Sequence, residues 1–209
     1  AQMSHQREIS EFVQRLKKLL SYNLGKEGRQ TTLRMELEIV KEYIALQQMR
    51  YDFIIEMNIE DGSYLDQPTV RMLFQPLVEN AIRYGLGDDE KISIQVFEDV
   101  ARHFAVVTIS DSGKGLNQEE IDEINQPFDY DWGYWKNENR GIGLRYVKAM
   151  LESFYDGQTS LFVNSKKGFG TKITILLPVR EPEEKKEKDK EVTLEENKVG
   201  QTDERIDCR

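Results

Sequence analysis

The spacing of the apolar residues changes several times along the chain, and this change limits the folds open to it. Residues 6–22 carry apolar residues at helical spacing, and a second such stretch follows Thr31 and Thr32, either of which can cap a helix. A short glycine-containing connection joins the two, which predicts an antiparallel helix pair. The two stripes comprise Ile9, Phe12, Val13, Leu16, Leu19 and Leu20, and then Leu33, Leu37, Val40 and Ile44. Because such stripes need covering, a second copy of the chain is a candidate partner.

From residue 53 the apolar residues alternate, which predicts a strand over 53–60. Helical spacing returns from Gln67 and predicts a long helix, in which Pro76 would remove a hydrogen bond and cause a local kink. Two pairs of strands follow, over 91–97 with 104–110 and over 160–164 with 170–178, separated by an irregular loop and another helix. Strands that arrive in pairs favour an α+β fold with helices on one face of the sheet.

Composition excludes several classes of protein. The formal net charge is −9 and no broad basic face is present, so the chain is not predicted to bind nucleic acid. The single cysteine, Cys208, excludes a disulfide framework and favours a reducing, cytoplasmic setting. No apolar run approaches the roughly 18 to 20 residues of a membrane span. Residues 181–209 are highly charged and predict a disordered tail.

Two polar stretches suggest the walls of a binding site. In "FQPLVENAIRYG" Asn80 lies at the edge of the apolar stripe, with Arg83 and Tyr84 about one turn further on. In "ISDSGKGL" Asp111 ends a strand, where a carboxylate can accept a hydrogen bond from an exocyclic amine. The glycines that follow, Gly113 and Gly115, let the backbone approach a flat ligand. Taken alone, a local cap and an ordinary turn would explain these residues as well.

Two further stretches each contain a pair of glycines. Gly141 and Gly143 open a helix whose N-terminal N–H groups can bind an anion, and Arg140 stands just before them. In "GFGTKITI" two glycines precede a strand that Thr171 enters. Each stretch by itself is weak, because many helices and strands begin after glycine. The four stretches together, in this order, are far more specific than any one of them.

The four stretches resemble the motifs of one known family. "LVENAIRYG", "DSGKG", "RGIGL" and "GFGTKITI" are similar to the N, G1, G2 and G3 boxes of the GHKL ATP-binding fold of sensor histidine kinases. "TLRMELEIVKEYIALQQMRY" followed by "QPLVENAI" resembles the LytS/YesM-like subfamily, and the resemblance covers roughly residues 9–178. It implies a two-layer α/β sandwich with a mixed, mostly antiparallel sheet, preceded by a helical segment. Residues 1–50 would be the remainder of the dimerisation and histidine-phosphotransfer region, 51–180 the ATP-binding catalytic domain and 181–209 the tail.

The resemblance also implies a role for individual residues, with ATP and Mg²⁺ as ligands. Asn80 would coordinate Mg²⁺ and act in catalysis together with Arg83, and Tyr84 would lie near the phosphates with Arg83. Asp111 would bind the adenine amino group. The other ATP-binding positions would be Gly113 and Gly115 beside the base, Arg140, Gly141, Gly143 and Leu144 at the phosphates, and Thr171 near the base through a water molecule.

Between Leu116 and Asn139 the family has a mobile lid, which here contains five aromatic residues. They either close over the nucleotide and exclude water, or bury themselves against the domain or a partner. These residues are Phe128, Tyr130, Trp132, Tyr134 and Trp135.

The phosphoacceptor histidine is the part of the family pattern that the chain lacks. Nothing matches a motif such as "PHFLYN": His5 lies outside it, and His103 stands between two strands, where a turn histidine is the better interpretation. We therefore expect a protein histidine kinase fragment that binds ATP but does not autophosphorylate. Its phosphoacceptor would be a histidine on an upstream helix, its partner a response regulator, and its setting the cytoplasmic side of a membrane-bound bacterial sensor.

Two alternatives remain open, and one activity is disfavoured. Pro76 stands where the hydrolytic relatives (gyrase, MutL and Hsp90 types) place a general-base Glu, so fast ATP hydrolysis is not expected. A serine kinase of the anti-sigma type shares the boxes, but the two helices before the first strand argue against it. A non-catalytic nucleotide-sensing module is disfavoured by the intact Asn80, Asp111 and box glycines.

Overall fold

The structure, a computed structural model, describes residues 2–25, 31–87, 91–125 and 142–180. The predicted tail, Arg140, Gly141 and the five aromatic lid residues therefore lie outside the described residues. Residues 1–178 group into one compact unit.

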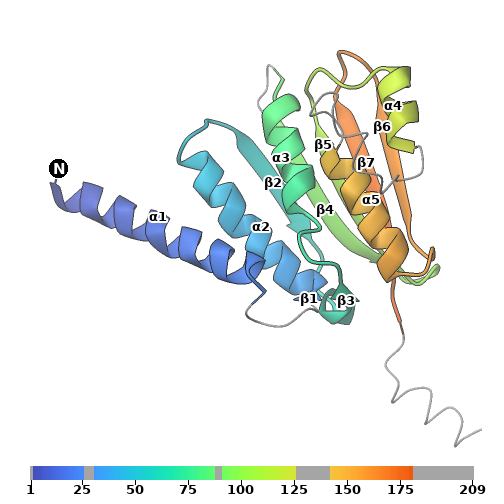
Figure 1. Cartoon of the computed structure of the whole chain (residues 1–209), viewed down its shortest axis with the longest axis horizontal. Helices are drawn as coiled ribbons and strands as arrows, with labels where there is room; N and C mark the ends of the chain where they lie inside the picture. The colour runs from blue at the N-terminus through green and yellow to red at the C-terminus, as the bar shows by residue number, and fades with distance from the viewer. Residues whose placement is uncertain (1, 26–30, 88–90, 126–141, 181–209) are drawn as a thin grey trace, which may run out of the picture. The chain divides into compact units, whose positions relative to one another are not determined.

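A five-stranded sheet forms one layer of this unit (Figure 1). Its order is β2-β4-β5-β7-β6, built from β2 (Ile54–Ile59), β4 (Lys91–Asp99), β5 (Phe104–Asp111), β6 (Ser160–Ser165) and β7 (Thr171–Pro178). Only β2 and β4 pair in parallel, and every other neighbouring pair is antiparallel. The predicted mixed, mostly antiparallel sheet is confirmed.

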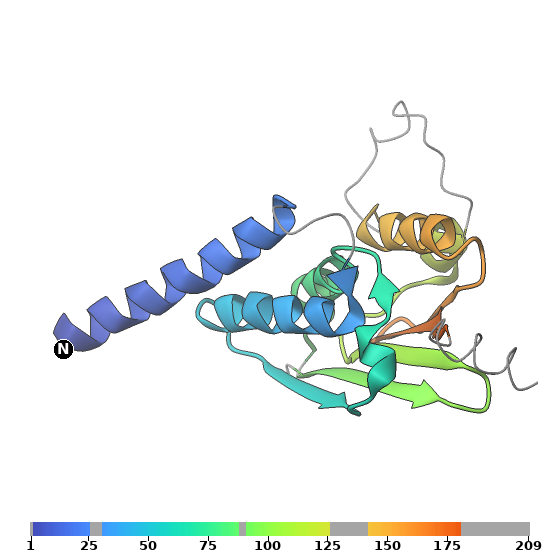
Figure 2. The ribbon, with the colours of Figure 1, turned by 90° about the horizontal axis from the view of Figure 1, so that it is seen from below.

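Helices cover one face of the sheet (Figure 2). They are α2 (Leu33–Gln48), α3 (Gln75–Tyr84), α4 (Gln118–Asn125) and α5 (Ile142–Phe154). The side of the sheet beneath them is apolar because alternate strand residues point the same way, as Ile92, Ile94 and Val96 of β4 show by their burial. Leu77 of α3 and Leu151 of α5 are buried in the same core. The two-layer α+β fold is thus confirmed.

The predicted helix pair is present and antiparallel. α1 (Gln2–Asn23) packs on α2, whose N-cap Thr32 accepts a hydrogen bond from Met35 N. Glu42 late in α2 binds Arg15 in the middle of α1 at 2.5 Å, while Glu36 early in α2 contacts Tyr22 at the end of α1. No helix among the described residues has the length and apolar character needed to cross a membrane.

The long helix predicted from Gln67 is wrong at its start, because α3 begins only at Gln75. Before it, β3 (Pro68–Thr69) pairs with β1 (Thr31–Thr32), and Met72 has a φ of 59°, which no right-handed helix contains. The N–H groups of Met72 and Leu73 donate to the carboxylate of Glu36, at 2.9 and 2.7 Å, instead of continuing a helical ladder. The apolar residues of this stretch are buried all the same, in a turn that follows the short 3₁₀ helix η1 (Ser63–Asp66).

The kink predicted at Pro76 is also wrong, for a related reason. Pro76 stands in the first turn of α3, where backbone N–H groups have no helical partner in any case. Its missing N–H therefore costs no helical hydrogen bond, and the proline helps to define where the helix begins.

Helix α4 lies within the stretch predicted to be an irregular loop. It begins with a capping box in which Glu120 N donates to Asn117 Oδ1 and Asn117 N donates to Glu120 Oε2, both at 2.9 Å. The Asn-x-x-Glu spacing of this box is the sequence signal that would have predicted the helix. His103 is exposed in the β4–β5 turn with a φ of 56°, which agrees with its interpretation as a turn residue.

Candidate functional site

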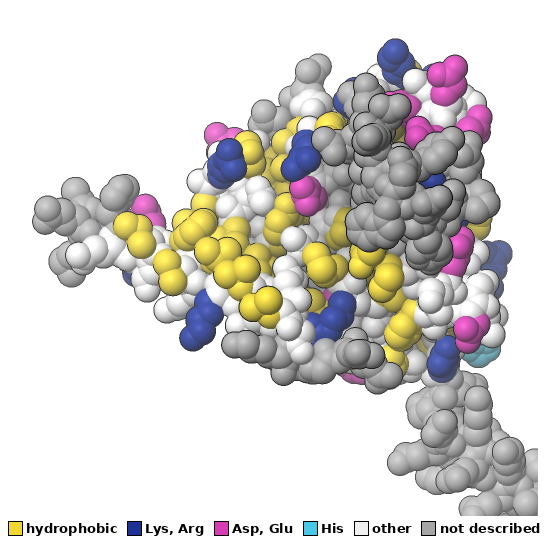
Figure 3. Space-filling view, viewed as in Figure 1, with side chains coloured by type: hydrophobic (Ala, Val, Ile, Leu, Met, Phe, Trp, Pro, Cys, Tyr) yellow, Lys and Arg dark blue, Asp and Glu magenta, His cyan; other side chains and the backbone are white. Residues whose placement is uncertain are grey.

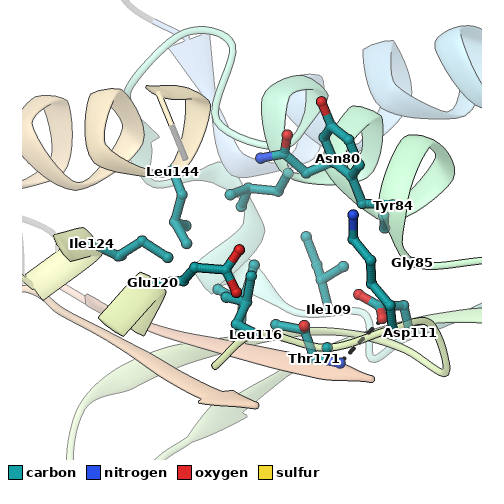
Figure 4. Close-up of a pocket in the computed structure, with 15 residues that line it drawn as sticks. Asn80, Tyr84, Gly85, Ile109, Asp111, Leu116, Glu120, Ile124, Leu144 and Thr171 are labelled. Atoms are coloured by element: carbon teal, nitrogen blue, oxygen red, sulfur yellow. Dashed lines mark hydrogen bonds between the residues drawn. The ribbon is translucent and has the colours of Figure 1, made fainter. Parts of the chain in front are cut away.

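A pocket opens between the helical layer and the end of the sheet where β5 stops (Figure 4). Six of the residues predicted to bind ATP line it, and they come from α3, β5 and its following loop, α5 and β7: Asn80, Tyr84, Asp111, Gly115, Leu144 and Thr171. Apolar side chains such as Ile109 and Ile173 also line it, so the pocket combines apolar surface with a small number of polar groups.

Asp111 is a polar group at one end of this pocket, where β5 stops. Its Oδ1 accepts hydrogen bonds from the N–H groups of Gly113 and Thr171, each at 3.1 Å. Burial raises the pKa of Asp111, although the two N–H groups act in the opposite direction. Within the described residues Oδ2 has no hydrogen bond, so this oxygen can accept one from a ligand amine.

Glycines allow the backbone to close tightly around Asp111. A Cβ on Gly113 would lie 2.4 Å from Gly85 Cα, and one on Gly170 would lie 2.0 Å from the carbonyl oxygen of Asp111. Gly115 has a φ of +64° and passes against the carbonyl oxygen of Lys166, where a Cβ would come within 2.1 Å. No larger residue fits at these positions, which explains the glycines of the G1 and G3 boxes physically.

The second end of the pocket lies where α3 meets α5. Asn80 is half-buried on α3 and faces the pocket (Figure 4). A Cβ on Gly143 would lie 3.4 Å from Asn80 Nδ2 and 3.3 Å from Pro76 Cβ, so the first turn of α5 packs directly beside the carboxamide. The N–H groups of the first described turn of α5 are therefore near Asn80.

The remaining predicted residues lie apart from the pocket lining. Gly113 is buried behind the pocket wall. The Arg83 side chain is 59% exposed and pairs with Glu79 at 2.7 Å. Arg140 and Gly141 are outside the described residues. The predicted roles of these residues stay predictions.

Nine lining residues were not predicted as site residues from the sequence, among them Lys114, Leu116 and Glu120. Lys114 stands between the two G1 glycines, its ammonium 4.8 Å from the centre of the Tyr84 ring. Leu116 and Glu120 come from the loop and from α4. The pattern "DSGKG" points to its glycines and not to the lysine between them. For Glu120 the capping box is the one local signal.

Ser165 supports the pocket wall from behind. Its Oγ lies 2.9 Å from Thr171 Oγ1, donates to the Gly170 carbonyl at 2.8 Å and accepts from Leu116 N at 2.8 Å. One hydroxyl thus ties the loop after β5 to the β6–β7 hairpin, which keeps Thr171 next to Asp111.

Comparison with known proteins agrees with this geometry. Residues 65–181 match the family model described as "Histidine kinase-, DNA gyrase B-, and HSP90-like ATPase". The chain belongs to this family. Residues 1–54 match a second model, described as "Histidine kinase".

Sensor protein kinases are among the relatives of the chain. Sensor protein kinase HptS of Staphylococcus aureus (strain bovine RF122 / ET3-1) is 30% identical over 168 residues, which cover 80% of this chain and 32% of that protein. HptS of strain USA300 matches to the same extent. The chain thus spans about a third of the length of these relatives.

Solved histidine kinases share the fold. The catalytic domain of ThkA has a TM-score of 0.52 at 16% identity, covering 71% of this chain and 93% of that one. Acinetobacter baumannii AdeS has a TM-score of 0.53 at 17% identity, covering 86% and 82%. The family models and the sensor kinase relatives support the ATP-binding catalytic domain of a histidine kinase.

Proposed function

We propose that this domain, as part of a LytS/YesM-like sensor kinase, transfers the γ-phosphoryl group of ATP to a histidine on an upstream helix. The observation that carries the proposal is the convergence of Asn80, Asp111, Leu144 and Thr171, from four separate elements, on one pocket, with Gly143 packed beside Asn80. These residues provide an amine acceptor at one end and an oxygen ligand beside a helix N-terminus at the other.

The end of the pocket at Asp111 suits the adenine base. Asp111 Oδ2 would accept from the exocyclic amine, and Thr171, held by Ser165, would take part through a water molecule. Gly113 and Gly115 allow the wall to approach the plane of the base, and Ile109 and Ile173 provide apolar surface on which the ring can lie. The raised pKa of Asp111 does not prevent this role, because the two N–H donors favour its charged form.

The second end suits the triphosphate. The N–H groups at the start of α5 can bind an anion, and the carboxamide oxygen of Asn80 is a ligand of the kind that a hard cation accepts. No group of three His, Cys, Asp or Glu side chains able to hold a metal occurs among the described residues. The single carboxamide oxygen of Asn80 fits Mg²⁺, which takes few protein ligands and is otherwise held by water and phosphate oxygens. When bound, Mg²⁺ would neutralise charge on the phosphates.

The contribution of this domain to phosphoryl transfer is then positioning. Asp111 and Thr171 hold the base, while Asn80 and the first turn of α5 orient the phosphates toward the acceptor. Pro76 in place of a general-base Glu leaves water without activation at this position, which favours transfer over hydrolysis.

The helical segment supports histidine as the acceptor. Residues 1–54 match the histidine kinase model, and α1 and α2 form an antiparallel pair as expected for the remainder of a dimerisation and phosphotransfer region. This favours a histidine over the serine acceptor of an anti-sigma-type kinase. The full protein would be a membrane-bound sensor that passes the phosphoryl group to a response regulator.

Nucleotide titration tests the site. The wild-type chain should bind a non-hydrolysable ATP analogue, and more tightly with Mg²⁺, as measured by isothermal titration calorimetry. Asp111→Asn should weaken binding roughly a hundred-fold, because a carboxamide presents N–H groups as well as an oxygen to the base amine. Asn80→Ala should remove mainly the gain that Mg²⁺ provides.

Wild-type-like binding by both variants would overturn the site assignment. A second experiment supplies the acceptor as a separate fragment of the full kinase, together with radiolabelled ATP. Acid-labile, base-stable label on histidine is the expected result, whereas label on serine or threonine would support the anti-sigma-type alternative.

A further inference from the structure

We propose that Lys114, the residue between the two G1 glycines, is a nucleotide-binding residue whose ammonium contacts the phosphate groups. The inference rests on the proposed function, since it takes an adenine nucleotide as the ligand. Among the described lining residues Asp111 and Glu120 carry negative charge, and Lys114 is the sole cation. A polyanionic nucleotide entering beside two carboxylates needs such a charge nearby.

The other cation expected at this end is Arg83, whose side chain is hydrogen-bonded to that of Tyr84. Arg83 pairs with Glu79 on the exposed side of α3 and does not line the pocket. No described carboxylate lies within ion-pair distance of Lys114, so its charge is not already neutralised by a neighbour of this kind. Lys114 is thus placed on the pocket wall to supply the positive charge that the family resemblance assigned to Arg83.

The backbone of Lys114 is held at both sides. Gly113 N donates to Asp111 Oδ1 at 3.1 Å, and the Lys114 carbonyl accepts from Gly168 N at 2.6 Å. The next residue, Gly115, has the positive φ that lets the loop turn against Lys166. The side chain therefore starts from a well-defined point at the base end of the pocket.

From that point the side chain reaches toward the phosphate end. Its ammonium lies 4.8 Å from the centre of the Tyr84 ring. Tyr84 follows Asn80 by one helical turn on the same side of α3, and Figure 4 shows the two side chains next to each other. An ammonium at Tyr84 is therefore close to the residue proposed to hold Mg²⁺. The cation–π contact holds the lysine near this position without the directional bonds that would prevent it from moving to a phosphate oxygen.

A ligand series tests the proposal. Adenosine, AMP, ADP and a non-hydrolysable ATP analogue are titrated into the wild-type chain and Lys114→Met by calorimetry. Adenosine should bind both proteins within about two-fold, because methionine retains the apolar stem. The ATP analogue should bind Lys114→Met roughly ten-fold more weakly or worse, as a charge-assisted hydrogen bond is lost. The first ligand in the series whose affinity falls identifies the phosphate that Lys114 contacts.

Lys166→Met is the matched control. Lys166 belongs to the same loop pair and makes a similar contact, with its ammonium 4.5 Å from the centre of the Phe169 ring, but it does not line the pocket. It should bind the whole series like the wild type, and Lys114→Arg should retain most of the affinity for the ATP analogue.

Three results would overturn the proposal: equal losses for adenosine and the ATP analogue, equal losses in the Lys166 control, or no loss at all. The proposed function fails separately. If the wild type binds neither adenosine nor the ATP analogue, the nucleotide site is wrong. If the wild type and Lys114→Met bind the series alike and Asp111→Asn does not, only the role of Lys114 is wrong.

Discussion

At the scale of single residues, the pocket depends on the absence of side-chain atoms as much as on their presence. Gly85 ends α3 directly behind Asp111, and a Cβ there would lie 2.4 Å from Asp111 Cγ and 2.7 Å from the Ala81 carbonyl oxygen. Gly85 has a φ of −102°, which any residue can adopt, so the glycine is required by space and not by backbone conformation. The position of the Asp111 carboxylate thus depends on a residue outside the G1 box.

Gly85→Ala should displace the Asp111 carboxylate and weaken binding of the ATP analogue by roughly ten-fold or more. Overpacking should also lower the free energy of unfolding by about 1–3 kcal/mol. Calorimetric titration and urea unfolding measure the two effects.

Gly157→Ala is the control for Gly85→Ala. Its φ of +73° makes alanine strained by about 1–2 kcal/mol, but nothing lies within 4 Å of the added Cβ. It should lose stability and bind nucleotide normally. If Gly85→Ala also binds normally, the glycine does not position Asp111.

At the scale of elements, Glu36 connects both helices of the pair to the segment that leads into α3. The side chain is 2% exposed and accepts hydrogen bonds from the Tyr22 hydroxyl of α1 and from the N–H groups of Met72 and Leu73. Arg71 adds a second link, because its guanidinium lies over the Tyr22 ring and donates to the Tyr22 carbonyl at 2.7 Å. The start of the helix that carries Asn80 is therefore attached to the end of α1.

The pKa of Glu36 lies above its usual value, because burial disfavours the charged form more strongly than its hydrogen bonds favour it. Between the raised pKa and the ordinary value, the folded protein binds a proton that the unfolded chain does not. The unfolding free energy of the wild type should therefore rise relative to Glu36→Gln as pH falls from about 7 toward 4.5. Urea unfolding of both proteins across this range measures the difference.

Glu42→Gln provides a control of opposite sign. Lys18 and Arg15 lower the pKa of Glu42, so the unfolded chain takes up the proton first. The wild type should lose stability relative to Glu42→Gln once the pH falls toward the ordinary value of 4.5. A pH-independent difference between the wild type and Glu36→Gln would show that the buried carboxyl does not titrate as expected.

At the scale of the whole molecule, the helix pair and the sheet belong to the same compact unit. α2 packs against α3 and η1, so contacts cross the predicted boundary at residue 50, and that boundary stays a prediction. Hydrophobic side chains gather over the helices on the face shown in Figure 3. On α1 they include Ile9, Val13 and Leu20, which are 60%, 55% and 52% exposed. An apolar stripe of this kind needs a partner.

We expect a second copy of the chain to cover this stripe. Sedimentation equilibrium should show a dimer for the wild type, and Leu16→Glu with Leu20→Glu should be monomeric, because dimerisation would bury two charges per chain in an apolar interface. Gln6→Glu with Gln14→Glu adds the same charge to exposed polar positions of α1 and should remain dimeric. A wild-type chain that is monomeric at all concentrations would contradict the expectation.

Local patterns in the sequence predicted most of the elements and several of the residues that line the pocket. Periodicity acts over short windows, which is why α1, α2 and all five strands of the sheet were predicted, and why Asp111 was expected at the end of a strand. The box motifs predicted that Asn80, Asp111 and Thr171 lie close together, and all three line one pocket, because each box places its polar residue at the end or edge of an element. Their roles in binding nucleotide stay predictions.

Features that depend on partners far away along the chain became visible only in the fold. The start of α3 is set by Glu36, which lies 36 and 37 residues before the two N–H groups that it binds. The space requirement of Gly85 and the orientations of Arg83 and Lys114 could not be predicted for the same reason. A local sequence pattern does not indicate which distant side chain a residue will face. Local propensity selects the elements, whereas hydrogen bonds and close contacts between distant segments decide where they end and which charges face the pocket.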